Sequence, residues 1–99
     1  MIQEKELLEQ TSFKQEAEML RALGHPVRLK ILCGLMSESC CVKIMQECLN
    51  IPQAALSQHL AVLKGVGVIE GIRYGNLVIY KIRSSFVNQL MTLLIKEAK

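Results

Sequence analysis

The spacing of the apolar residues changes from a helical to a strand pattern close to Gly67, and this change constrains the fold most strongly. Before it, Leu56, Leu60 and Leu63 recur at i, i+4 and i+7, which places them on one face of a helix. After it, residues 68–82 (VIEGIRYGNLVIYKI) are rich in β-branched and aromatic side chains around a Gly-Asn turn, a pattern typical of a β-hairpin. We therefore expect a mainly helical fold that carries one small hairpin.

Helical periodicity also predicts the elements on either side of this hairpin. Gly24 and Pro26 separate the first two helices, because glycine suits a helix end and proline suits the first turn of the next helix. Ser84 or Ser85 can cap the last helix. The chain has 99 residues, the usual size of one domain, so we expect residues 1–99 to fold as a single unit. The expected helices cover residues 3–23, 26–36, 41–49 and 53–65 and a last one ending at Lys96, and the expected strands cover 68–73 and 77–82.

Two short helices joined by a break at residues 50–52 and followed by a hairpin have the order of a winged helix-turn-helix. We assign residues 41–65 to the helix-turn-helix and residues 68–82 to the wing. The second helix of such a pair enters the DNA major groove, where amide and hydroxyl groups bond base edges. The predicted fold class is mainly α with a small β-hairpin wing, in the order α-α-α-α-β-β-α.

The candidate DNA-binding residues lie on the 53–65 helix and on the wing. Arg28 either contacts a phosphate or buttresses the turn, and the sequence leaves both roles open. The residues expected to reach base edges are Gln53, Ser57, Gln58 and His59. The residues expected to hold the DNA backbone are Lys64, Arg73, Tyr74 and Asn76.

Charge is divided unevenly along the chain, which favours an anion as partner. Residues 1–20 hold five Glu and two Lys, whereas residues 21–99 hold ten Lys or Arg and four Glu. An acidic first segment before a basic body suggests an anion-binding surface.

An enzyme is not expected, because the chain has no Asp, no Ser/His/carboxylate constellation and no Gly-rich phosphate loop after a strand. The alternative class is a winged helix that binds protein, but its exposed face on residues 53–65 should be more apolar.

Two segments resemble the ArsR/SmtB family of bacterial transcriptional repressors. They are LRALGHPVRLKILCGL at residues 20–35 and IPQAALSQHLAVLKGVGVIEGIRYGNLVIYKI at residues 51–82. The patterns HPxRLxIL and SQHLxxL are the strongest marks, and the likeness covers about residues 20–83 closely. The resemblance implies a homodimer built from the first and last helices, operator binding in the apo or reduced state, and release by an inducer.

The residues support the dimer independently of the resemblance. The last helix shows too much apolar surface for a monomer of this size, which favours dimerisation through residues 84–99. The resemblance implies that residues 1–23 form the rest of the dimer interface. Twofold symmetry would place two recognition helices about one DNA turn apart, so the double-stranded operator should be an imperfect palindrome.

No apolar run approaches the roughly 18 residues of a membrane span, and the start MIQEKELLEQ lacks the basic and apolar parts of a secretory signal. We therefore expect a cytoplasmic protein with no membrane partner.

The resemblance also implies where a signal would act. On the 41–49 helix, Cys41 aligns with the first Cys of the family's ELCVC-like metal motif, but Lys43 stands at the second and is a poor ligand. The family's zinc site on the last helix needs Asp and His, which residues 83–99 lack. Cys33 matches a cysteine of the sulfur- and redox-responsive branch, but no partner cysteine lies near the end of this chain. Neither known ligand set nor the known thiol pair is complete here.

Three hypotheses for the signal stay open, and they concern four cysteines expected to be reduced: Cys33, Cys40, Cys41 and Cys48. In the first, Cys33 with the Cys40/Cys41 pair binds a thiophilic ion such as As(III), the one candidate cofactor. In the second, the same thiols respond to oxidants or reactive sulfur species. In the third, the thiols are incidental and the repressor is independent of ligand.

The first two hypotheses are favoured, because adjacent thiols at a helix start should have a lowered pKa and react readily. A disulfide between Cys41 and Cys48 within one helix is excluded. Seven residues rise ~10.5 Å along a helix, whereas bridged Cα atoms lie within ~7 Å of each other.

Overall fold

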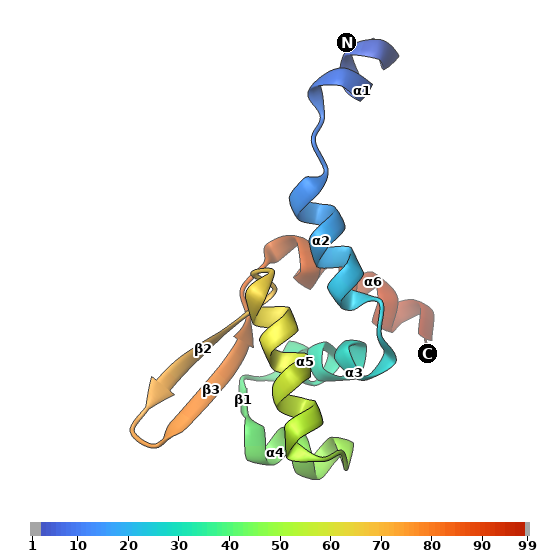
Figure 1. The fold of residues 1–99 in the computed structure, drawn as a ribbon. Coiled ribbons are helices and arrows are strands. Elements are labelled where there is room, and N and C mark those ends of the chain that lie inside the picture. The colour runs from blue at the N-terminus through green and yellow to red at the C-terminus, as the bar shows by residue number, and fades with distance from the viewer. Residues whose placement is uncertain (1–2, 99) are drawn as a thin grey trace.

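The computed structural model describes residues 3–98, and its element order is that of a winged helix-turn-helix (Figure 1). The predicted class, mainly α with a small β-hairpin wing, is confirmed. Residues 1, 2 and 99 of the expected dimerisation segments lie outside the described residues. The elements are α1 (Glu4–Gln10), α2 (Lys14–Leu23), α3 (Pro26–Ser37), β1 (Cys40–Cys41), α4 (Val42–Leu49), α5 (Gln53–Gly65), β2 (Ile69–Tyr74), β3 (Leu77–Ile82) and α6 (Ser85–Ala98).

The helix expected over residues 3–23 is wrong as one element, because the structure divides it into α1 and α2. Thr11, the C-cap residue of α1, is extended at φ −87° and ψ 123°. Thr and Ser are weak helix formers, and Thr11 is followed by Ser12. Apolar residues continue at near-helical spacing across this break, so periodicity alone did not reveal it. Figure 1 shows α1 standing away from the other helices.

The wing contains a short strand that the sequence did not predict. β1 pairs antiparallel with β3, with Cys40 opposite Tyr80 and Cys41 opposite Ile79, and the sheet order is β1-β3-β2. The expected helix start at residue 41 is therefore wrong by one position, because Cys41 is the extended N-cap residue and α4 begins at Val42. A strand of two residues has no periodicity from which it could be predicted.

The hairpin of β2 and β3 confirms the predicted wing and its turn. The register runs from Ile69 opposite Ile82 to Tyr74 opposite Leu77. Gly75 in the turn has φ +60°, a left-handed conformation that glycine adopts without a steric penalty. The wing therefore extends from the helical body as a regular two-stranded ribbon (Figure 1).

The buried core lies where α2, α3, α5 and α6 meet at the base of the wing. The predicted inner face of α5 is confirmed, because Leu56, Leu60 and Leu63 are all buried. Ser84 caps α6, as its Oγ accepts a hydrogen bond from the Val87 backbone N–H at 3.2 Å. Between residues 3 and 98, no helix is both long enough and apolar enough to cross a membrane.

Candidate nucleic-acid interface

The α4–α5 connection sets the orientation of the predicted recognition helix. Asn50 ends α4 in the left-handed conformation at φ 53°, and its backbone N–H donates to the Gln46 carbonyl at 2.8 Å. Pro52 then precedes α5, whose buried leucines hold it against the core. This local geometry leaves the opposite side of α5 open to solvent.

The exposed side of α5 carries three of the four predicted base-reading residues. Gln53, Ser57 and Gln58 are exposed, and Lys64 is exposed at the C-terminal end of the helix. Among the described residues, the side chains of these three make no hydrogen bond within the protein. The helix has no carboxylate of its own. The arrangement presents polar, uncharged groups that can bond to base edges.

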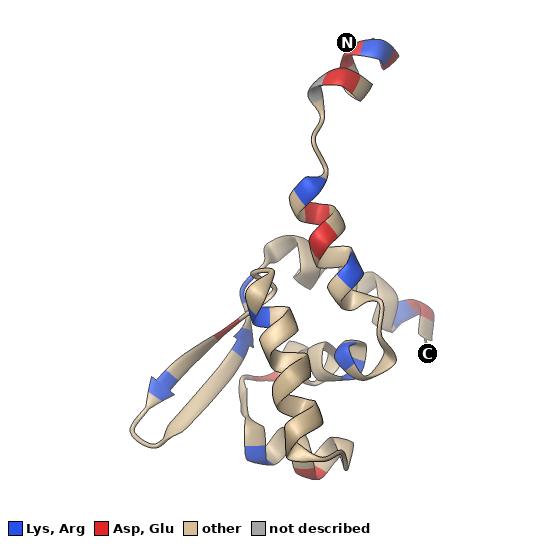
Figure 2. Ribbon diagram, viewed as in Figure 1, with Lys and Arg blue, Asp and Glu red and all other residues tan. Residues whose placement is uncertain are grey.

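The wing adds exposed residues beyond the end of α5. Arg73, Tyr74 and Asn76 are all exposed at the tip of the hairpin. Lower on the wing, Lys81 pairs with Glu70 across the strands at 3.4 Å. Figure 2 shows acidic residues on α1 and the start of α2, at the far end of the molecule from the wing tip. The acidic segment therefore does not lie beside the residues predicted to hold the DNA backbone.

His59 does not lie with the other three predicted readers. It is half-buried, and its Nδ1 accepts a hydrogen bond from Arg28 Nε–H at 3.2 Å. Its ring centroid lies 4.6 Å from that of His25. Partial burial lowers the pKa of His59 below 6.5, and His25 and Arg28 lower it further. Of the two roles left open for Arg28, these contacts favour the buttress.

Three of the four cysteines line two separate surfaces. Cys33 lines an apolar groove between α3 and α6, whereas Cys40 and Cys48 line an apolar cleft of about 180 Å³ between α3 and α4. The structure does not bring Cys33 together with the Cys40/Cys41 pair, as the As(III) hypothesis required. Within residues 3–98 there is no group of three or more His, Cys, Asp or Glu side chains that could hold a metal ion.

The prediction of a lowered pKa is wrong for Cys40. Burial raises the pKa of this thiol above 9.0, and the neighbouring Cys41, Cys48 and Glu38 raise it further. A backbone hydrogen bond with Cys41 opposes these effects and lowers the pKa. Cys40 lies in β1, where its side chain turns into the cleft, and not in the first turn of α4.

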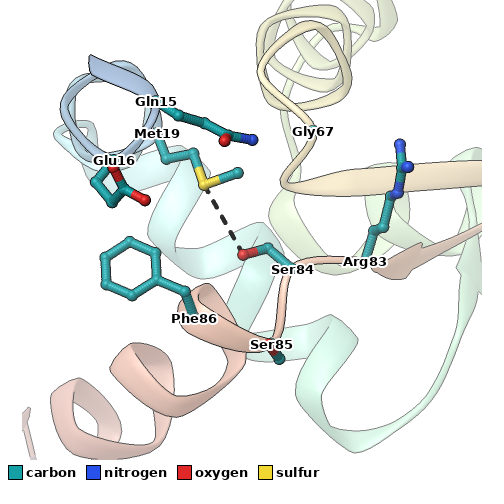
Figure 3. Close-up of a pocket in the computed structure, with 8 residues that line it drawn as sticks. All are labelled: Gln15, Glu16, Met19, Gly67, Arg83, Ser84, Ser85 and Phe86. Carbon is teal, nitrogen blue, oxygen red and sulfur yellow. Dashed lines mark hydrogen bonds between the residues drawn. The ribbon is translucent and has the colours of Figure 1, made fainter. Parts of the chain in front are cut away.

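A further pocket of about 360 Å³ lies where α2, the α5–β2 turn and the start of α6 meet (Figure 3). Ser84 Oγ reaches across it to Met19 Sδ at 3.8 Å. Gly67 forms part of its wall with φ +78°, a conformation that favours glycine. No sequence pattern singled out this junction, because its residues come from three distant segments. It connects both predicted dimerisation segments to the base of the wing.

Comparison with known proteins identifies the family. A family model described as bacterial regulatory protein, arsR family, matches residues 25–70. The HTH-type transcriptional regulator YgaV of Escherichia coli is 34% identical over 86 residues, covering 86% of this chain and 87% of that protein. The HTH-type transcriptional repressor SmtB of Mycobacterium tuberculosis is 43% identical over 65 residues, which are 66% of this chain and 48% of that protein. The chain thus matches about half the length of this repressor.

The fold comparison agrees with the sequence comparison. The homodimeric winged helix-turn-helix DNA-binding domain of a Mycobacterium bovis protein superposes with a TM-score of 0.78 at 26% identity. The match covers 99% of this chain and 87% of that one. The resemblance stated from the HPxRLxIL and SQHLxxL patterns is therefore confirmed, and the chain belongs to the ArsR family of bacterial regulatory proteins.

Proposed function

We propose that the chain is a sequence-specific, DNA-binding transcriptional repressor. The observation that carries the proposal is the exposed face of α5, where Gln53, Ser57 and Gln58 offer amide and hydroxyl groups without a carboxylate among them. In the proposal these side chains contact base edges in the major groove. The DNA backbone is held by exposed residues of α5 and the wing, which are Lys64, Arg73, Tyr74 and Asn76. No catalytic step is part of this function.

We further propose that the repressor is a homodimer. Leu8 of α1, Leu20 of α2 and Leu93 of α6 are 81%, 47% and 63% exposed, more apolar surface than a monomer usually leaves in water. The Mycobacterium bovis relative is itself homodimeric, which supports a dimer here. Two copies of α5 about 34 Å apart would then read successive major grooves, so an imperfect palindrome is the proposed operator.

The proposal is tested with DNA that the protein itself selects from a random duplex pool. We expect repeated selection to enrich a palindrome, and fluorescence anisotropy to show binding that weakens steeply with salt. Gln58→Ala should lose about tenfold or more of its preference for the selected site, because one bidentate base contact disappears. The same variant should keep close to the wild-type affinity for an unselected duplex, because its phosphate contacts are unchanged. Enrichment of no sequence, or binding indifferent to salt, would favour the protein-binding alternative.

For the signal, we propose that a thiol-reactive inducer acts at the cleft that Cys40 and Cys48 share. The proximity of these two thiols supports this choice over Cys33, which lines a different groove. Arsenite and, separately, a persulfide donor are added to the DNA complex. Release should be lost in the Cys40→Ser/Cys48→Ser double variant and kept in Cys33→Ser. If neither compound releases the wild type, the ligand-independent alternative is favoured.

A further inference from the structure

One guanidinium joins three helices at the inner side of α5. Arg28 of α3 donates from Nε to His59 Nδ1 of α5 at 3.2 Å, and from Nη1 to the Ala22 carbonyl of α2 at 3.1 Å. The two bonds leave the same planar group, so they fix α5 relative to α2 in direction as well as distance. α2 belongs to the proposed dimerisation segment, and α5 is the proposed recognition helix.

The bond to His59 requires a neutral imidazole. An imidazole nitrogen accepts a hydrogen bond only when it carries no proton, so this contact places the single ring proton of His59 on Nε2. Protonation would remove the acceptor and set a second positive charge against Arg28. The bond therefore exists only above the pKa of His59.

The surroundings of His59 favour its neutral form. The titratable groups that face it are Arg28 on α3 and His25, whose ring lies 4.6 Å away at an angle of 57°. His25 Nδ1 itself accepts the Val27 backbone N–H at 3.1 Å and caps α3. On the α2 side, Glu18 and Arg21 line the pocket that Arg28 also lines. None of the charges that face His59 is a carboxylate that would stabilise an imidazolium.

We propose that Arg28 and His59 are positioning residues, which hold α5 in its DNA-reading orientation only while His59 is neutral. The inference rests on the proposed function and adds a pH dependence to it. The direction of this pH dependence separates two roles for His59. A histidine that touched DNA itself would strengthen phosphate binding when protonated. A positioning histidine weakens operator binding when protonated, since α5 is then released from α2 and α3.

The test measures affinity for the selected operator by anisotropy at constant ionic strength, from about pH 8 to about pH 4.5, a range that extends well below the ordinary histidine pKa because the pKa of His59 is lowered. Wild-type affinity should fall by about tenfold on acidification, the factor expected from losing one hydrogen bond to a charged group. Far-UV circular dichroism at each pH verifies that the protein stays folded. A flat profile, or affinity that rises toward low pH, overturns the inference.

Three variants assign the effect to particular groups. His59→Asn keeps an acceptor near the Nδ1 position without a titrating proton, so its affinity should match the wild type at about pH 8 and stay flat. His25→Asn keeps a good N-cap, so operator affinity should still fall on acidification. The midpoint of that fall should lie at higher pH, because one cause of the lowered His59 pKa is removed. Arg28→Lys keeps the positive charge but loses the planar guanidinium that makes both hydrogen bonds. It should bind the operator about tenfold more weakly at about pH 8. Persistence of the full acid loss in His59→Asn overturns the inference.

A measurement without DNA separates this inference from the proposed function. Nitrogen NMR of the free protein should show the His59 ring protonated at Nε2 alone at neutral pH. Protonation at Nδ1 would overturn the positioning role even in a protein that binds its operator. A wild type that binds no duplex at any pH, with the Nε2 tautomer present, would overturn the proposed function and the inference that rests on it.

Discussion

Replacing either of two glycines with alanine should change the free energy of unfolding, and the two changes should have opposite signs. Gly71 lies on β2 opposite Tyr80 of β3. A Cβ built at this position would lie 2.8 Å from Val78 Cγ1 and 3.0 Å from Tyr80 Cε1. Gly34 lies within α3, and a Cβ there would meet no atom within 4 Å. The same chemical change therefore meets a crowded site in the wing and open space on a helix.

The expected magnitudes follow from this geometry. Gly71→Ala overpacks the wing, which typically lowers the free energy of unfolding by about 1–3 kcal/mol. The loss is only partly offset by the ~0.4–1 kcal/mol that a Gly→Ala change gains through the unfolded chain. Gly34→Ala should raise the free energy of unfolding by about 0.5–1 kcal/mol, because glycine is unfavourable inside a helix. The two variants should thus differ in melting temperature by several degrees, with opposite signs relative to the wild type.

Thermal unfolding followed by circular dichroism measures this difference. All samples need the same protomer concentration, since the stability of a dimer depends on it. Val78→Ala removes the closer of the two clashing atoms, so it should recover part of the loss in a Gly71→Ala background. An unchanged or raised melting temperature for Gly71→Ala would refute the argument from crowding. A lowered melting temperature for Gly34→Ala would refute the argument that an added Cβ meets open space on α3.

The remaining predictions concern a cap, a thiol and the core. Ser84→Ala should lower the free energy of unfolding by about 1 kcal/mol through loss of the α6 cap, whereas Ser85→Ala should leave the urea midpoint unchanged. Because the pKa of Cys40 is raised above 9.0, its contribution to stability is complete below that pH and is lost as pH rises through the raised pKa. Urea titrations at alkaline pH should therefore show a decline that Cys40→Ser reduces. At neutral pH, iodoacetamide followed by mass spectrometry should find the exposed Cys33 alkylated faster than Cys40. Leu32→Ala, at a side chain with no exposed surface, should cost about 2–5 kcal/mol in the same urea assay.

The elements predicted correctly from the sequence are those with several turns or pairs of periodic residues. Leu56, Leu60 and Leu63 define α5, and the alternation around Gly75 defines the wing. The break after α1 and the pairing of β1 were missed for different physical reasons. The first interrupts a helix without interrupting its apolar spacing, and the second depends on a strand that lies far along the chain.

The cysteines show why proximity is harder to predict than secondary structure. Cys33 and Cys40 are seven residues apart, and both lie on or next to α3. Yet the phase of α3 turns Cys33 toward α6, whereas the turn after Ser37 carries Cys40 to the other side, against α4. Which thiols share a site therefore depends on packing of whole helices, and residue spacing within one helix could exclude only the pair Cys41 and Cys48.

The placement of His59 follows from the sequence more directly than the placement of the cysteines. It follows Leu56 by three residues and precedes Leu63 by four, and both of these side chains are buried. Helical phase alone therefore sets His59 at the edge of the inner face of α5, apart from Ser57 and Gln58. Its partner Arg28 lies in the other segment that carried the family resemblance, 31 residues away. The two patterns, HPxRLxIL and SQHLxxL, thus meet in one hydrogen bond. Because of this bond, replacing both Arg28 and His59 should lower the free energy of unfolding by less than the sum of the two single replacements. A double-mutant cycle should give a coupling energy of about 0.5–3 kcal/mol.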